Sequence, residues 1–296
     1  MGQIIWMAAH EVKTKRTYEI LGSEISMAHH SRRNLDGVDF MALVSHKYRF
    51  IYFKNYKVAG TSVEELFSQY CVNPDSSFKY ETSLSFDKGY LDGVKIELDS
   101  TGDEYYDREY GIVGRTNGLG NDAFRGHSNA TRIKKYFAEH EDLGMGKFDE
   151  YLKFCVVRNP YDKMVSLYHW QTQHPLGQNI YHNITFKEFC KKTDLKNLEA
   201  VHGIDGKSVC DYFIRYEHLQ EDIVRLCEIL NLPDYDITTL PHHKSGLRPS
   251  GKHYREYYDE ETQNIVYEKH QDEFELFEYA HSLKSLEGVV CGGDVV

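Results

Sequence analysis

The sequence lacks any long hydrophobic run. No apolar stretch approaches the roughly 18 residues that a membrane-spanning helix needs. The N-terminal stretch Ile4–Ala9 is too short for the apolar part of a secretory signal, and no basic residue precedes it. We therefore expect a cytoplasmic protein that neither crosses a membrane nor docks on one.

Cysteine and proline are scarce, and both are scattered. The 296 residues contain six cysteines without a C-x-x-C pair, whereas zinc sites and redox motifs use such close spacing. His242, His243 and His253 have no cysteine or carboxylate at a recognisable spacing. We therefore expect no metal site and no disulfide framework. The absence of internal repeats and low-complexity stretches favours one domain.

Basic residues are fewer than acidic ones. The chain has 35 Lys and Arg against 46 Asp and Glu, which gives a net charge of −11. Nucleic-acid-binding proteins need a basic surface, so nucleic acid is excluded as a partner. The acids are unevenly placed: residues 81–109 hold nine acids and three bases, and residues 255–278 hold nine acids and two bases. Residues 46–62, by contrast, contain four bases and no acid.

Three strand-then-helix units follow one another along the chain. Short apolar runs predict the strands, and apolar residues at helical spacing predict the helices. The pairs are 48–53 with 61–70, 152–157 with a helix that begins at Asn159-Pro160, and 212–216 with 217–230, and a last helix is expected over 260–279. Alternating strands and helices indicate an α/β fold with a central parallel sheet covered on both faces.

This pattern gives a simple domain plan. We predict an N-terminal arm over residues 1–45 and a folded domain over 46–285 with an insertion at about 72–125. A short C-terminal tail over 286–296 completes the plan.

The loop between the first predicted strand and helix reads Lys57-Val-Ala-Gly-Thr-Ser62. A cation before a turn of small residues, with two hydroxyls at a helix N-terminus, is suited to a phosphate or sulfate group. It is not a Walker A loop, in which the lysine follows the second glycine. The alternative is an ordinary turn in which Thr61 caps the helix and Lys57 is exposed.

A second loop follows the strand 152–157. Arg158 comes directly after this strand, and Ser166 lies eight residues later, within Val-Val-Arg-Asn-Pro-Tyr-Asp-Lys-Met-Val-Ser. Together the two loops resemble those of the sulfotransferases that use 3′-phosphoadenosine-5′-phosphosulfate (PAPS), most closely the branch with carbohydrate 2-O-sulfotransferases and small bacterial enzymes. The segments Gly126-His-Ser-Asn-Ala-Thr131, Arg215-Tyr-Glu217 and Tyr254-Arg-Glu-Tyr-Tyr258 are also similar to that family, and the resemblance covers roughly 46–280. Tyr56 departs from it, because the family has proline there.

The resemblance implies a three-layer αβα fold like that of the P-loop nucleotide triphosphatases. It also implies PAPS as co-substrate, PAP as product and no metal. His127 would be the general base, and Lys57 would stabilise the leaving phosphate. The cofactor would be bound by a set of residues from both loops and from a later basic segment: Lys57, Ala59, Gly60, Thr61, Ser62, Arg158, Ser166, Lys244, Ser245 and Arg248.

Two other functions stay open. One is a nucleotide-dependent kinase on a related fold, and the other is a non-catalytic nucleotide- or glycan-binding module. The acceptor is expected to be a small molecule or a carbohydrate. Because acidic residues are concentrated away from the cofactor loops, a neutral or cationic natural product is favoured over a polyanionic glycan.

Overall fold

The computed structural model describes residues 42–78, 105–114, 129–140, 144–173, 181, 183–195, 200–240, 248 and 252–283. Three predicted site residues, His127, Lys244 and Ser245, lie outside these ranges.

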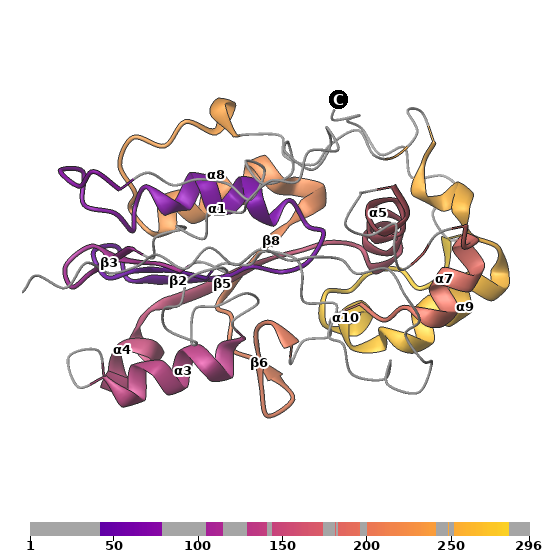
Figure 1. Cartoon of the computed structure of the whole chain (residues 1–296), viewed down its shortest axis with the longest axis horizontal. Helices are drawn as coiled ribbons and strands as arrows, with labels where there is room; N and C mark the ends of the chain where they lie inside the picture. Colours follow the sequence, from indigo (N-terminus) through magenta and orange to yellow (C-terminus); the bar gives the residue numbers. More distant parts are fainter. Residues whose placement is uncertain are drawn as a thin grey trace, which may run out of the picture.

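The fold is built on a six-stranded sheet with the order β3-β4-β1-β2-β5-β8 (Figure 1). Strands β2, β5 and β8 pair in parallel, as the three strand-then-helix units require. A small hairpin of two further strands lies outside this sheet. The strands are β1 (Ala42–Ser45), β2 (Phe50–Phe53), β3 (Tyr105–Asp107), β4 (Gly111–Val113), β5 (Leu152–Val157), β6 (Gly203–Ile204), β7 (Lys207–Ser208) and β8 (Tyr212–Arg215).

The other half of the main sheet is antiparallel, which the prediction of a parallel sheet did not include. Strand β1 pairs antiparallel with both β2 and β4, and β4 pairs antiparallel with β3. Only four residues separate β1 from β2, too few for the crossover that parallel neighbours need. The sheet thus begins before residue 46, where the folded domain was predicted to start. Part of the predicted insertion at 72–125 also belongs to the sheet, as strands β3 and β4.

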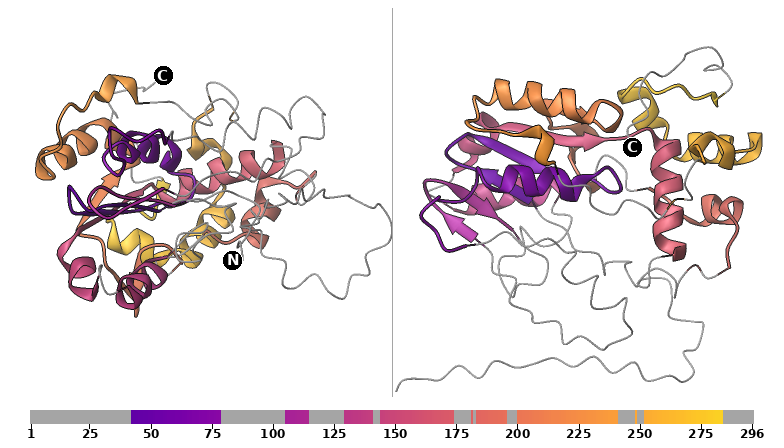
Figure 2. Two further views of the ribbon diagram at one scale, coloured as in Figure 1. Left: turned by 60° about the vertical axis from the view of Figure 1, so that its left-hand side comes forward. Right: turned by 90° about the horizontal axis from the view of Figure 1, so that it is seen from above.

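Helices cover both faces of the sheet (Figures 1 and 2). Helices α1 (Gly60–Ser68) and α8 (Leu219–Ile229) lie on one face, and α3 (Ala130–Glu139) and α4 (Gly144–Glu150) lie on the other. The alternation of side chains along β5 serves both layers: Phe154 and Val156 pack with α1 and α8, whereas Cys155 and Val157 pack with α3 and α4. The expected three-layer αβα architecture is confirmed.

The remaining helices pack together beside the sheet, around a third apolar cluster that includes Tyr161, Phe189 and Phe274. They are α5 (Pro160–Gln173), α7 (Phe186–Lys192), α9 (Glu260–Lys269) and α10 (Gln271–Leu276), and the short 3₁₀ turns are η4 (Tyr216–His218), η5 (Ile237–Thr239) and η6 (Tyr254–Tyr257). The single helix predicted over 260–279 is broken at His270, whose φ of −133° and ψ of 28° are not helical. None of the helices in the described ranges has the length and apolar character needed to cross a membrane.

Candidate active site

The first loop joins β2 to α1 and leaves the helix N-terminus without a side-chain cap. Lys57 and Ala59 have φ values of 57° and 61°, in the left-handed region that few residues other than glycine adopt. Ala59 occupies the N-cap position and makes no capping hydrogen bond through its side chain. Thr61 and Ser62 lie in the first helical turn, so the alternative in which Thr61 caps the helix is wrong. An uncapped N-terminus favours an anionic ligand.

Buried polar contacts hold this loop against the sheet. The Tyr52 hydroxyl donates a hydrogen bond to the Gly60 carbonyl at 3.2 Å, and Lys54 forms a buried ion pair with Glu64 of α1 at 2.5 Å. A Cβ atom at Gly60 would lie 3.0 Å from Lys54 Cγ and 3.1 Å from the Asn55 carbonyl oxygen. A larger residue at Gly60 would therefore require the Lys54 side chain and the Asn55 backbone to shift by a few tenths of an ångström.

The second loop meets the first at Arg158, directly after β5. Arg158 Nη1 donates to the carbonyl oxygen of Lys57 at 2.9 Å, and Arg158 Nε and Nη2 bind Asp162 Oδ2 at 2.8 and 2.7 Å. The guanidinium also lies over the Tyr216 ring, 3.9 Å from its centroid. These contacts involve all three guanidinium nitrogens, which together carry five N–H donors.

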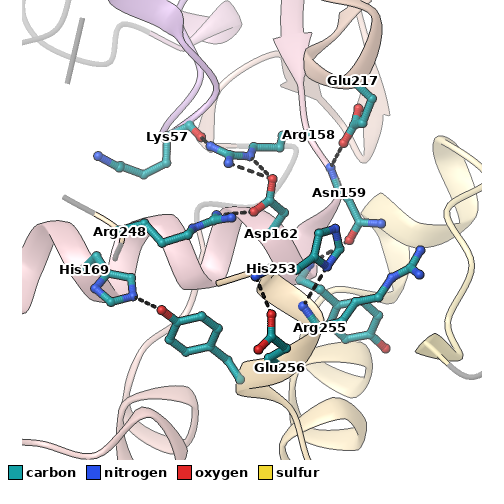
Figure 3. A network of polar contacts seen from close by, with 12 residues as sticks. Lys57, Arg158, Asn159, Asp162, His169, Glu217, Arg248, His253, Arg255 and Glu256 are labelled. Atoms are coloured by element: carbon teal, nitrogen blue, oxygen red, sulfur yellow. Dashed lines mark hydrogen bonds and ion pairs between the residues drawn. The ribbon is translucent and has the colours of Figure 1, made fainter. Parts of the chain in front are cut away.

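Asp162 joins two arginines at this point. Its second oxygen binds Arg248 Nη2, so Arg158 and Arg248 share one carboxylate (Figure 3). Burial by itself would raise the pKa of Asp162, but the two guanidinium charges and their hydrogen bonds outweigh burial and lower that pKa. One carboxylate neutralises only one of the two cations, so the cluster keeps a net positive charge.

The start of α5 is tied to the end of β8. Glu217 accepts a hydrogen bond from the Asn159 backbone N–H at 2.7 Å and another from the Tyr279 hydroxyl at 3.2 Å. Arg215 donates to the Phe277 carbonyl at 3.0 Å. Glu217 thus holds the second loop, whereas Arg215 holds the segment at the end of α10.

A comparison with known protein families identifies the family of the chain that carries these two loops. The model of the sulfotransferase family matches residues 41–280. The chain belongs to the sulfotransferase family. It is also 33% identical over 97 residues to an uncharacterized protein of Archaeoglobus fulgidus, an alignment that covers 31% of this chain and 78% of that protein. No solved structure matches at a significant level.

The fold of this sulfotransferase brings some of the predicted site residues together. Lys57, Ala59, Gly60, Thr61 and Ser62 form the first loop, and Arg158 links that loop through Asp162 to Arg248. Ser166 lies on α5, two helical turns beyond Arg158, and is half-buried. The positions of His127, Lys244 and Ser245 are outside the described residues.

Several residues around the sulfotransferase site escaped the sequence analysis. Asp162 is the main one, although its spacing of four from Arg158 on a helix is a signal for an ion pair. His169 Nε2 forms a hydrogen bond with the Tyr257 hydroxyl at 2.7 Å, and Lys252 Nζ lies 4.0 Å from the centroid of the Tyr257 ring. Burial, followed by the charges of Arg248 and Lys252, lowers the pKa of His169, so its imidazole is neutral at pH 7.

Trp170 lies beside the first loop. Lys57 Nζ is 5.3 Å from the centroid of the Trp170 ring, within the range of a cation–π contact. The Lys57 carbonyl faces Arg158 while its side chain extends away from the arginine (Figure 3). The Lys57 side chain thus places a cation beside Trp170, and the Lys57 backbone carbonyl accepts the hydrogen bond from Arg158 that holds the second loop.

Proposed function

We propose that this enzyme transfers a sulfuryl group from PAPS to a hydroxyl group of a small-molecule or carbohydrate acceptor. The observation that carries the proposal is the 2.9 Å hydrogen bond from Arg158 to the Lys57 carbonyl, which joins the two loops. Strands β2 and β5 are parallel neighbours, so the loops that follow them leave the same edge of the sheet. Ligands of open α/β sheets bind at that edge.

In the proposed complex the two loops bind opposite ends of the nucleotide. The uncapped N-terminus of α1, with Gly60, Thr61 and Ser62, binds the 5′-phosphosulfate. Arg158 binds the 3′-phosphate with its remaining N–H donors, and Ser166 adds a hydroxyl. Arg248 contributes to the nucleotide from the opposite side of Asp162. We assign Lys244 and Ser245 to the nucleotide from the sequence alone.

The reaction forms one S–O bond and breaks another. The acceptor oxygen attacks sulfur in line with the bridging oxygen of the phosphosulfate, and its proton passes to a base, for which we propose His127. The bond between sulfur and the bridging oxygen breaks, and its electron pair stays on the 5′-phosphate of PAP. The Lys57 ammonium offsets that developing charge.

The His127→Ala variant should lower kcat by about 10²- to 10⁴-fold, the usual contribution of a general base. Binding of PAP should stay near the wild-type value, because the imidazole acts on the acceptor. Single-turnover assays and PAP titrations separate the two effects, with His218→Ala as a control at an exposed histidine. Full activity in His127→Ala would remove this residue as the base.

The Arg158→Lys variant should weaken PAP binding by about 10- to 100-fold, the equivalent of one charged hydrogen bond. Lysine keeps the charge but cannot bind Asp162, the Lys57 carbonyl and a phosphate with one planar group. Calorimetric titration with PAP measures the loss, and Arg132→Lys on the exposed face of α3 is the matched control. Unchanged PAP affinity in a folded Arg158→Lys protein would contradict this assignment.

We also propose that the acceptor is neutral or cationic. Part of the acid in residues 255–278 is neutralised within the fold, because Glu261 pairs with Lys187 and Lys191 and Glu273 pairs with Lys163. The preference therefore rests mainly on the acids of residues 81–109. A panel of alcohols, phenols and glycans with labelled PAPS, read by mass spectrometry for an added sulfate, tests it. A polyanionic glycan as best acceptor would overturn the preference without affecting the proposed donor.

A further inference from the structure

Cys155 and a later histidine and cysteine, His202 and Cys210, meet on one face of the sheet. The thiol sulfurs of Cys155 and Cys210 and one ring nitrogen of His202 all lie within 4.8 Å of one another. Cys155 and His202 are buried, with 0% and 2% of their surface exposed, and Cys210 is half-buried. We propose that these three side chains bind a single Zn²⁺ ion.

The backbone fixes the positions of all three residues. Cys155 lies in β5, which is hydrogen-bonded on both sides, to β2 and to β8. His202 and Cys210 flank the β6–β7 hairpin, and the Val209 N–H donates to the His202 carbonyl at 2.9 Å. Asp205 and Gly206, with φ values of 52° and 75°, close the hairpin in a turn of type I′. Two of the ligands are therefore set by a tight hairpin and the third by a central strand.

Ser208 orients the histidine and the second cysteine. His202 Nδ1 is hydrogen-bonded to Ser208 Oγ at 2.9 Å, and the same oxygen accepts from the Cys210 backbone N–H at 3.1 Å. In the tautomer that donates from Nδ1–H to Ser208 Oγ, Nε2 is the ring nitrogen that offers a lone pair to a metal.

The donor set selects the metal. Two sulfurs and one imidazole suit zinc, whereas calcium and magnesium require oxygen ligands. On binding, each thiol loses its proton to solvent and forms a Zn–S bond, so the two thiolates balance the charge of the ion. Zn–S bonds of about 2.3 Å place two tetrahedral sulfurs roughly 3.8 Å apart, so small side-chain movements close the site. A water molecule completes the tetrahedron.

The proposed zinc site is distinct from the nucleotide site. Cys155 points into the cluster with α3 and α4, whereas the phosphosulfate loop starts α1 on the opposite face (Figure 1). Cys155 also lies three residues before Arg158, which directly follows β5. The ion would thus hold the β6–β7 hairpin against β5, the strand that precedes Arg158, a structural role that does not depend on the proposed reaction.

Cobalt substitution tests the proposal directly. The full-length protein, reduced and stripped of metal with a chelator, is titrated with Co²⁺. We expect one Co²⁺ per chain, with the visible d–d bands of a tetrahedral ion and thiolate-to-cobalt charge-transfer bands. One equivalent of Zn²⁺ should abolish both sets of bands and raise the thermal unfolding temperature.

Variants decide which residues bind the ion. Cys210→Ser and His202→Ala should each remove the tetrahedral spectrum and the thermal shift, while Cys227→Ala and His218→Ala should keep both. If His202→Ala does not fold, the Cys210→Ser variant is sufficient by itself, because Cys210 is partly exposed and its replacement should be tolerated. Wild-type protein without tetrahedral bands would overturn the proposal. So would bands that persist in folded Cys210→Ser, or a Cys155–Cys210 disulfide in the metal-free protein as isolated.

Discussion

Replacing Lys57 by methionine should lower kcat for sulfuryl transfer by about 10²- to 10³-fold, the effect of losing one group that stabilises developing charge in a transition state. Methionine keeps the apolar stem beside Trp170 and removes only the ammonium. The carbonyl that accepts from Arg158 belongs to the backbone and is retained. PAP binding should therefore change little, because the loss concerns charge that develops only as the S–O bond breaks.

The measurement is single-turnover transfer with saturating PAPS, combined with a PAP titration. Lys47→Met is the matched control, since Lys47 is an exposed lysine in the turn between β1 and β2. Equal losses in PAP affinity and in turnover would assign Lys57 to ground-state binding instead. Unchanged turnover would remove Lys57 from the chemistry.

Replacing Lys163 by methionine should lower the free energy of unfolding by about 3–5 kcal/mol. Lys163 Nζ lies 2.8 Å from Glu273 Oε1 and 3.2 Å from Oε2, and the exposed fractions of the two side chains are 0% and 8%. The single change leaves a buried carboxylate without its cation. The pair links α5 to α10, so its loss also loosens the helix that follows Arg158.

Urea unfolding of the single and double variants measures this effect. Lys163→Met combined with Glu273→Leu should recover most of the lost stability, because the double change buries no charge. Lys135→Met is the control, since its ion pair with Glu139 is exposed and contributes little. A single variant as stable as wild type would show that water or another group compensates the Glu273 charge.

The sequence was most informative where local patterns set the structure. Strand β5 has the predicted bounds, 152–157, because its short apolar run is followed at once by Asn159-Pro160, which begins a helix. Lys57, Gly60 and the two hydroxyls also predict that the first loop binds an anion, which stays a prediction, and the helix does begin within that loop. The resemblance of these loops to those of sulfotransferases predicts the family of the chain. The match to the family model confirms that prediction.

Features that depend on tertiary packing were missed. The antiparallel strands β1, β3 and β4 are three or four residues long, too short to show periodicity. The break at His270 within the last helix left no proline or glycine in the sequence to mark it. The Asp205-Gly206 pair does carry a hairpin signal, but Cys155 lies 47 residues before His202. Cysteine spacing alone predicted no metal, whereas the zinc proposal rests on contacts that only the fold creates.

The central claim is that the two loops bind PAPS, and calorimetric titration of the wild-type protein with PAP, 5′-AMP and ATP tests it most directly. PAP and 5′-AMP differ only in the 3′-phosphate, which we assign to Arg158. We predict that PAP binds with one site per chain and at least about tenfold more tightly than 5′-AMP, the value of one charged hydrogen bond, and more tightly than ATP. Equal affinities for PAP and 5′-AMP, or preferred binding of ATP, would contradict the account and favour a kinase-like nucleotide site.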